Sequence, residues 1–415
     1  MEQTFRSVRL TPVKKSHDTG MIAVIICAAV ILALLAGLVL SLLAGVRGRA
    51  RNPYAAVTEA AGIIEDEFYF LEGIDGNTLA QSAIWGMLEA LDDPYAAYYT
   101  EEEYNEMLRS NAGDYQGIGI SVLPPDETGS MILTVYPDSP MEEAGALAGD
   151  IILSVNGTSA AGMQMDDFLA LFSEEDGGTD TLILLRGETQ FTVQATRREV
   201  HVARIFSEIL DGGIGYIRIE QFTGTVVTEF KAAVQEALAH GVSALVIDLR
   251  DNPGGGLTEV LGVASYLLPK GELICTLKSR HGAEKAYRAE GEERLTDMPI
   301  ALLVNGNSAS ASELLSGALQ DHGVATVIGT QTFGKGIVQS YYRLKDGAGW
   351  VKLTTDAYYT PHDVCIQGAG ITPDYVIELA ENWTEKAIGA IPHEEDAQLI
   401  AALDILDNIL RKAAA

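Results

Sequence analysis

The sequence predicts a multidomain protein of α/β and β type, with a transmembrane helix at its N-terminus. Three patterns support this prediction. Residues 21–44 carry no charged side chain. In residues 113–197 apolar positions alternate with polar ones, which is the period of half-buried strands. In residues 200–379, short strands that are apolar on both faces alternate with helices, as a buried parallel sheet requires. At 415 residues the chain is long enough for two or three domains.

Composition excludes several classes of protein. Acidic residues outnumber basic ones by 58 to 28, a formal charge of −30. No nucleic-acid partner is expected, because nucleic acid is bound by Lys and Arg that neutralise phosphates. Three Cys are too few for a disulfide scaffold. The seven His lack any paired ligand spacing, so no metal site is predicted. Cys275 and Cys365 either pair with each other or are small buried residues, and the sequence leaves both open.

The N-terminus is predicted to anchor the chain in a membrane. A basic tail, residues 1–20, precedes the uncharged run 21–44. At ~1.5 Å rise per residue this run reaches ~36 Å, enough to cross a hydrocarbon core of ~30 Å. It exceeds the ~7–15 residues of a signal-peptide apolar region, so we expect an uncleaved single-pass helix. Four basic side chains precede the run and three follow it before residue 52, so charge gives no clear orientation.

Residues 52–112 are predicted to form two or three helices, with apolar residues at helical spacing between Asp, Gly and Asn breaks. The sequence L-D-D-P-Y at 91–95 is typical of a turn, because the residue before Pro disfavours the helical conformation. Glu101, Glu102 and Glu103 open the next helix, where they favour the positive end of its dipole. We assign this segment a structural role.

Residues 113–197 combine a Gly-rich turn with a characteristic later strand. The turn reads Y-Q-G-I-G-I at 115–120, and the strand D-I-I-L-S-V-N-G at 150–157 ends in an Asn-Gly turn. In this order the two motifs resemble a PDZ domain of the kind found in bacterial proteases. The resemblance implies that backbone N–H groups of the turn bind the terminal carboxylate of a peptide. The residues concerned are Gly117, Ile118, Gly119 and Ile120.

Residues 200–379 are predicted to be an α/β domain, with strands at 214–219, 244–248, 300–305 and 326–329. Helices are expected between them, at 226–240, 258–267 and 312–321. Three motifs in this region carry chemistry.

The first motif is the turn L-R-D-N-P-G-G-G at 249–256, which leaves a strand and enters a helix. Bare backbone N–H groups at a helix start form an anion site, suited to a phosphate or to the oxyanion of acyl transfer. A sharp structural turn explains some of these glycines but not their number.

The second motif, N-G-N-S-A-S-A-S-E at 305–313, ends a strand and starts a helix. A helix cap explains one Ser but not three in alternation. We interpret Ser308 and Ser312 as caps, which leaves Ser310 for another role.

The third motif, G-T-Q-T-F-G-K-G at 329–336, nearly matches a phosphate-binding loop. Gly336 replaces the Ser or Thr that would hold Mg²⁺, which argues against a nucleotide site. A Lys between two glycines instead fits a dry pocket, where burial favours the neutral amine that acts as a general base. Gln339, four residues after Lys335, offers an amide that could orient it.

The order of these motifs resembles the tail-specific, or C-terminal processing, serine peptidases of the Ser-Lys type. The resemblance covers residues 52–379 and implies a tail-specific protease fold. It implies that Ser310 is the nucleophile, Lys335 the general base and Gln339 the orienting amide. The oxyanion hole would be the N–H of Ala311 with that of Gly254 or Gly255. We interpret Asp321, at the end of the same helix, as structural.

The expected function is therefore a membrane-anchored serine endopeptidase that binds the C-terminal tails of protein substrates through its PDZ domain. No cofactor is required. The resemblance places the catalytic body outside the cytoplasm and implies that the PDZ domain holds the dyad inactive until a tail binds. A catalytically dead peptide-binding scaffold and a non-proteolytic enzyme on a similar core are the alternatives. Residues 380–415 have helical spacing and either pack on the body or mediate homo-oligomer assembly.

Overall fold

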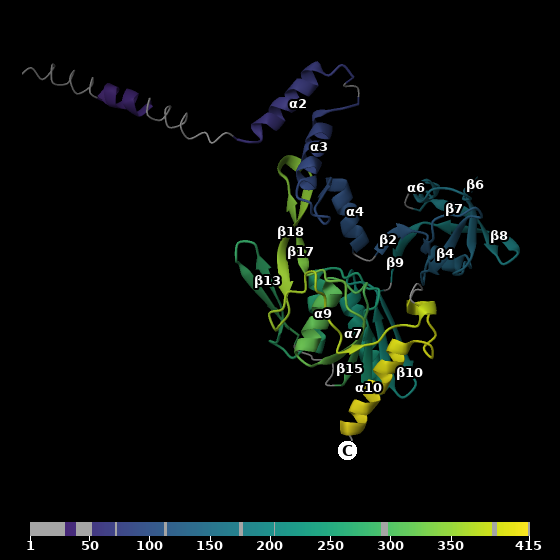
Figure 1. The fold of residues 1–415 in the computed structure, drawn as a ribbon. Helices are drawn as coiled ribbons and strands as arrows, with labels where there is room; N and C mark the ends of the chain where they lie inside the picture. Colours follow the sequence, from purple (N-terminus) through teal and green to yellow (C-terminus); the bar gives the residue numbers. More distant parts are fainter. Residues whose placement is uncertain are drawn as a thin grey trace, which may run out of the picture. The chain divides into compact units, whose positions relative to one another are not determined.

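The computed structural model describes residues 30–38, 52–70, 73–111, 114–173, 177–202, 204–291, 298–383 and 388–413. The chain forms two compact units, residues 1–86 and 87–415. Figure 1 shows the elements of each.

The N-terminal unit contains α2 (Ala55–Glu67) and most of α3 (Gly76–Glu89), which confirms that this region is helical. The predicted basic tail and most of the predicted span 21–44 lie outside the described residues. Residues 30–38 are described, and they are helical with exposed side chains. Within the described ranges, no helix combines the length and hydropathy needed to cross a membrane.

The second unit begins with a short strand, β1 (Ala97–Tyr99), and the helix α4 (Glu101–Asn111). Helix α4 starts where the three consecutive glutamates predict it. Its first turn is closed by reciprocal hydrogen bonds. The Glu103 N–H donates to Thr100 Oγ1 at 3.2 Å, and the Thr100 N–H donates to Glu103 Oε2 at 2.8 Å.

A small β domain follows, and it has a core of its own. Its main sheet has the order β3-β4-β5-β7-β8, with β6 paired to β5, and β2 pairs separately with β9. Buried side chains of three strands and one short helix, including Ile132, Ile152, Leu182 and Phe168, fill the core. The elements are β2 (Asp114–Gly117), β3 (Ile120–Val122), β4 (Ser130–Val135), α5 (Pro140–Glu143), β5 (Ile151–Val155), β6 (Thr158–Ser159), α6 (Met165–Leu169), β7 (Thr179–Arg186), β8 (Thr189–Thr196) and β9 (Arg198–His201).

The α/β domain that follows has a six-stranded sheet with the order β10-β11-β12-β15-β16-β19. Strand β10 runs antiparallel to β11, and the remaining neighbours are parallel. The predicted strands are confirmed within one residue at most ends. The strands are β10 (Ile205–Leu210), β11 (Ile214–Ile219), β12 (Ala244–Asp248), β15 (Ile300–Val304), β16 (Ala325–Gly329) and β19 (Tyr375–Val376).

Helices cover both faces of this sheet (Figure 1). Leu245 and Ile247 face one core, shared with α7 (Val226–Ala239), α8 (Leu257–Leu267) and α9 (Ala311–Asp321). Side chains at the alternate positions, such as Val246 and Leu303, face the other core, which is shared with α10 (Ala397–Ala413). Because both faces are buried, the strands are apolar throughout.

A second sheet in this domain was not predicted from the sequence. It has the order β1-β18-β13-β14, with β17 paired to β18. Its longest strands are half-buried along most of their length, so their apolar pattern is weak. The strands are β13 (Leu273–Ser279), β14 (Glu284–Arg288), β17 (Ile337–Arg343) and β18 (Trp350–Tyr359).

Both described cysteines are free thiols, Cys275 buried and Cys365 partly buried. Burial raises the pKa of Cys275 to about 12. Of the two possibilities left open by the sequence, the structure has the unpaired one.

A buried ion network attaches α10 to the large sheet. The guanidinium of Arg250 lies between the carboxylates of Asp248 and Asp396, with shortest distances of 2.6 and 2.8 Å. It also donates to Gln398 Oε1 at 3.0 Å, one residue into α10. Burial opposes the charge of Arg250, but the two carboxylates outweigh burial and raise its pKa. The network therefore fixes the start of α10 against the end of β12.

Replacing Arg250 with Met should destabilise the protein by about 3–5 kcal/mol, because two buried carboxylates lose their cation. Urea unfolding followed by circular dichroism measures the change. Arg411→Met is the matched control, because the ion pair of Arg411 with Asp407 is exposed to solvent. Equal stability of both variants would show that the buried network does not hold α10.

Candidate active site

The three chemical motifs meet because they leave the same edge of the sheet. Strands β12, β15 and β16 are parallel neighbours, so the loops after their carboxyl ends lie side by side. The loops are joined by hydrogen bonds. Ser308 Oγ donates to the Leu249 carbonyl at 2.8 Å, and the Phe333 N–H donates to the Ser308 carbonyl at 3.1 Å.

Ser310 occupies a strained position at the start of α9. It precedes the first helical residue and has φ 54° and ψ −109°. A positive φ is costly for a residue with a Cβ, and such outliers cluster at functional sites. With these angles Ser310 lies outside the helix, and its side chain lines a pocket.

The two flanking serines are not helix caps, so that part of the sequence interpretation is wrong. Ser308 is buried and bonds the end of β12, as described above. Ser312 is also buried, and its Oγ donates to the Asn252 carbonyl at 2.9 Å. Both hydroxyls attach the second loop to the first.

The carboxylate of Glu313 joins the Ser310 loop to the Lys335 loop. Glu313 is fully buried in the first turn of α9. Its Oε2 accepts from the Ser310 N–H at 2.8 Å and from the Lys335 N–H at 2.8 Å. Its Oε1 accepts from the Gly334 N–H at 2.6 Å and from Thr332 Oγ1 at 2.6 Å. Four donors thus bind one carboxylate. The N–H groups of Gly334 and Lys335, which belong to the third motif, are therefore not available to a phosphate.

The phenol of Tyr358, from β18, makes a second link between the two loops. Its hydroxyl lies 2.6 Å from the Ser310 carbonyl and 2.5 Å from the Lys335 carbonyl. Burial raises the pKa of Tyr358 well above its ordinary value, so the hydroxyl keeps its proton.

Close contacts with the backbone require two of the three glycines of the first loop. A methyl group on Gly254 would lie 2.7 Å from the Ala309 carbonyl oxygen and 2.9 Å from Ser310 Cβ. On Gly255 it would lie 2.2 Å from the Phe222 carbonyl oxygen, and on Gly256 it would meet the Glu259 carboxylate. Backbone atoms thus require glycine at 254 and 255, whereas the contact at 256 is with the end of a flexible side chain.

The amides beside Ser310 differ in whether they already have acceptors. The Gly254 N–H donates to Asn252 Oδ1 at 2.9 Å. In the described part of the chain, the N–H groups of Gly255 and Ala311 have no acceptor. Both residues line the same pocket as Ser310. Of the two glycines that the sequence leaves open, Gly255 has the available donor.

The amine of Lys335 lies on an aromatic ring rather than on Ser310. Its Nζ is 4.0 Å from the centroid of the Tyr95 ring, a cation–π contact. Among the described residues no hydrogen bond joins this amine to Ser310. Burial lowers the pKa of Lys335, the positive charge of Lys352 lowers it further, and Asp93 partly offsets both. The neutral form of the Lys335 amine is therefore more favoured than the neutral form of an exposed lysine.

Gln339 lies in β17 and lines the pocket, but its amide contacts Thr354 Oγ1 at 3.2 Å and not Lys335. Asp321 lies at the other end of α9 and accepts from the His362 N–H at 2.8 Å. This contact agrees with a structural role for Asp321.

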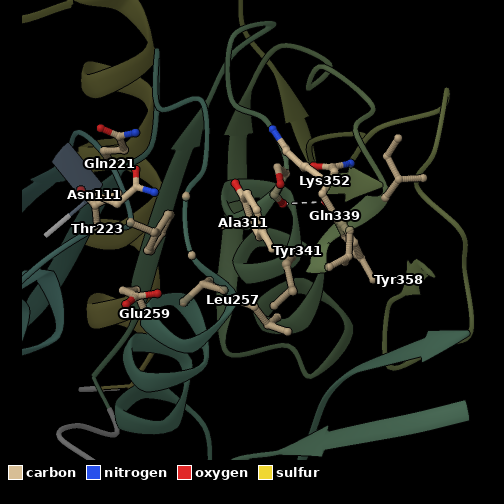
Figure 2. A pocket seen from close by; sticks show the side chains of 18 residues that line it. Asn111, Gln221, Thr223, Leu257, Glu259, Ala311, Gln339, Tyr341, Lys352 and Tyr358 are labelled. Carbon is tan, nitrogen blue, oxygen red and sulfur yellow. Dashed lines mark hydrogen bonds between the residues drawn. The ribbon is translucent and has the colours of Figure 1, made fainter. Parts of the chain in front are cut away.

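The pocket that holds Ser310 has a volume of about 450 Å³. Figure 2 shows Asn111, Gln221, Thr223 and Glu259 on one side of it and Gln339, Lys352 and Tyr358 on the other. Apolar lining comes from α8, α9 and β17. The pocket can hold an extended chain segment beside a hydroxyl and two unused amides.

In the small β domain, the Gly-rich turn lies between β2 and β3. Gly119 has φ 86°, and a Cβ there would lie 2.0 Å from Ser139 Cβ. Ile118 is buried in the domain core, and the ring of Tyr115 packs against Gly117. Both glycines are thus sterically required, and Ile120 begins β3.

Sequence reasoning missed several residues of this site. Tyr95 belongs to the D-D-P-Y turn, for which the sequence predicts a structural role, yet its ring contacts Lys335. Tyr358 and Lys352 come from a sheet that the sequence pattern did not predict. The sequence predicts that Glu313 lies in the first turn of a helix. It does not predict that the carboxylate joins two loops.

Comparison with known proteins matches three segments of the chain to protein families. Residues 213–377 match peptidase family S41, and residues 131–187 match the PDZ domain. Residues 47–103 match the N-terminal domain of the activating protease CtpB.

Curated relatives carry the same description. The chain is 36% identical to a carboxy-terminal-processing protease of Bartonella bacilliformis, over 73% of this chain and 70% of that protein. It is 34% identical to a carboxyl-terminal-processing protease of Picosynechococcus, over 79% of each. An S41-type structure from Bacteroides fragilis shares the fold, with a TM-score of 0.56 at 19% identity over 79% of this chain and 90% of that one.

Glu313→Gln should lower the free energy of unfolding by about 2–3 kcal/mol, because an amide group replaces an oxygen that accepts from buried donors. Chemical denaturation measures the change. Glu259→Gln is the control, since Glu259 lines the same pocket and has no hydrogen bond among the described residues. If the Glu313 variant were as stable as the control, the two loops would not depend on this carboxylate.

Proposed function

Because the chain belongs to peptidase family S41 and is a serine-type, carboxyl-terminal-processing peptidase with a PDZ domain, we propose that it cleaves peptide bonds with a Ser310–Lys335 dyad. The observation that carries this proposal is the shared carboxylate of Glu313. One buried group fixes the backbone of both residues, at the two loop positions where a nucleophile and its base are needed.

The proposed reaction begins with proton transfer from Ser310 Oγ to the neutral Lys335 amine. Oγ attacks the scissile carbonyl carbon, and the tetrahedral oxyanion accepts from the N–H groups of Ala311 and Gly255. The C–N bond then breaks, and the Lys335 ammonium protonates the leaving amine. Water attacks the resulting ester, gives a proton to Lys335, and Ser310 regains its hydroxyl proton as the C–Oγ bond breaks.

This reaction requires the Lys335 amine to leave the Tyr95 ring and reach Ser310. The contact with Tyr95 is a cation–π interaction of about 0.5–2 kcal/mol, so it is weak enough to exchange. Glu313 fixes the backbone of Lys335, while the side chain of Lys335 lies either on the Tyr95 ring or beside Ser310. These two positions correspond to a resting and a working state of the enzyme.

Substrate selection is assigned to the small β domain. In our proposal, the turn at Gly117–Ile120 binds the free C-terminus of a protein substrate and delivers its chain to the Ser310 pocket. We also propose that residues 21–44 anchor the protein in a membrane as a single span, with the catalytic body outside the cytoplasm. Assembly of the protein into a homo-oligomer is part of the same proposal.

The proposal is tested with the full-length protein in detergent, incubated with an unfolded protein of defined C-terminus. Wild type should degrade it, and Ser310→Ala and Lys335→Ala should each reduce the rate by about three orders of magnitude or more. Circular dichroism of each variant checks folding. Cleavage by Lys335→Ala at the wild-type rate would exclude the dyad.

The pH dependence gives a separate test, because only the neutral amine accepts a proton. The rate should rise with pH through the lowered pKa of Lys335. Lys352→Met removes a neighbouring positive charge, so the midpoint of this rise should move to higher pH. Asp93→Asn removes a negative charge, so its midpoint should move to lower pH. Profiles that coincide in all three proteins would contradict Lys335 as the base.

A further inference from the structure

One wall of the Ser310 pocket is a face of the β17–β18 hairpin. In its register, Gln339 pairs with Thr354 and Tyr341 pairs with Lys352. Residues that pair across strands, and residues two apart along a strand, share a face of the sheet. Gln339, Tyr341 and Lys352 therefore point to the same side, and all three line the pocket.

Lys352 is a half-buried cation without a counter-ion. Two other cations of the same sheet have counter-ions, Lys278 with Asp363 and Arg343 with Glu101. Within the described ranges, Lys352 makes no ion pair and no side-chain hydrogen bond. A cation without a partner in a pocket attracts anionic groups of a ligand.

The pocket carries opposite charges on its two sides. Glu259 and Lys352 are the only charged residues among those that line it. Figure 2 places them on opposite sides, with Ala311 between them. The Glu259 carboxylate lies against Gly256, at the start of α8. A peptide that passes Ser310 would thus meet a cation on one side and an anion on the other.

We propose that Lys352 is a specificity-determining residue that binds a carboxylate of the peptide substrate beside the scissile bond. The inference rests on the proposed function, because it takes the Ser310 pocket as the place of cleavage. The carboxylate is either an acidic side chain or the terminal carboxylate of a peptide that ends in the pocket. Glu259, on the opposite side of the pocket, would repel the same carboxylate. The carboxylate is therefore preferred on only one side of the scissile bond.

The test uses full-length protein and matched peptides with one cleavage site. One series carries Asp, Asn or Lys at each position flanking the scissile bond, and a second ends shortly after it as acid or amide. The variants are Lys352→Met, Lys352→Glu and the control Lys345→Glu, an exposed lysine that does not line the pocket. The measured quantity is the ratio of kcat/KM between paired peptides, in which changes in the base cancel.

Wild type should favour a carboxylate at one position by about threefold to tenfold. Lys352→Met should bring that ratio close to one, Lys352→Glu should reverse it toward Lys, and Lys345→Glu should keep it. A preference in the first series assigns the side chain, and one in the second assigns the terminal carboxylate. An unchanged ratio in both Lys352 variants, or no preference in wild type, overturns the proposal.

Two further measurements distinguish a failure of this inference from a failure of the proposed function. If a Lys352 variant does not cleave the Asn peptide, binding is measured by fluorescence anisotropy in a Ser310→Ala background, where loss of the carboxylate preference is again expected. If Ser310→Ala still cleaves the Asn peptide, the proposed function fails, whatever the Lys352 ratio. If Ser310→Ala is inactive and the Lys352 ratio stays unchanged, only the present inference fails.

Discussion

The geometry of the site depends on one buried carboxylate, that of Glu313. It accepts from the backbone of Ser310 on one loop and of Gly334 and Lys335 on another. A charged acceptor in a low-dielectric interior gives strong hydrogen bonds when all its lone pairs are used. The hydrogen bond from the Ser310 N–H to Glu313 helps to hold Ser310 at its strained φ. The proposed nucleophile is thus placed by a residue that never needs to touch the substrate.

The proposed base, Lys335, is held differently from the proposed nucleophile, Ser310. The backbone of Lys335 is fixed by Glu313 and Tyr358, whereas its side chain rests on the ring of Tyr95. Tyr95 lies in the turn before β1, a strand that pairs with β18 of the second sheet. A segment far away in the sequence therefore contributes a residue to the site. Its position allows the early part of the domain to influence where the lysine amine lies.

Much of the fold could be predicted from the sequence, and the site only in part. Strands buried on both faces, such as β12 and β15, have an unmistakable apolar pattern, and the glycines of the first loop signal close approach. The half-buried strands β17 and β18 have no such pattern, so Lys352 and Tyr358 could not be placed. Glu313 resembles an ordinary first-turn acid, because local sequence does not reveal which donors a distant loop will bring to it.

The central claim is that Glu313 and the strained turn single out Ser310 among three alternating serines as the nucleophile. The most direct measurement is reaction of the full-length protein with a fluorophosphonate, followed by peptide mapping of residues 305–320 by mass spectrometry. The account predicts one adduct, on Ser310, which is absent in Ser310→Ala. An adduct on Ser308 or Ser312, or one that persists in the Ser310 variant, would contradict it.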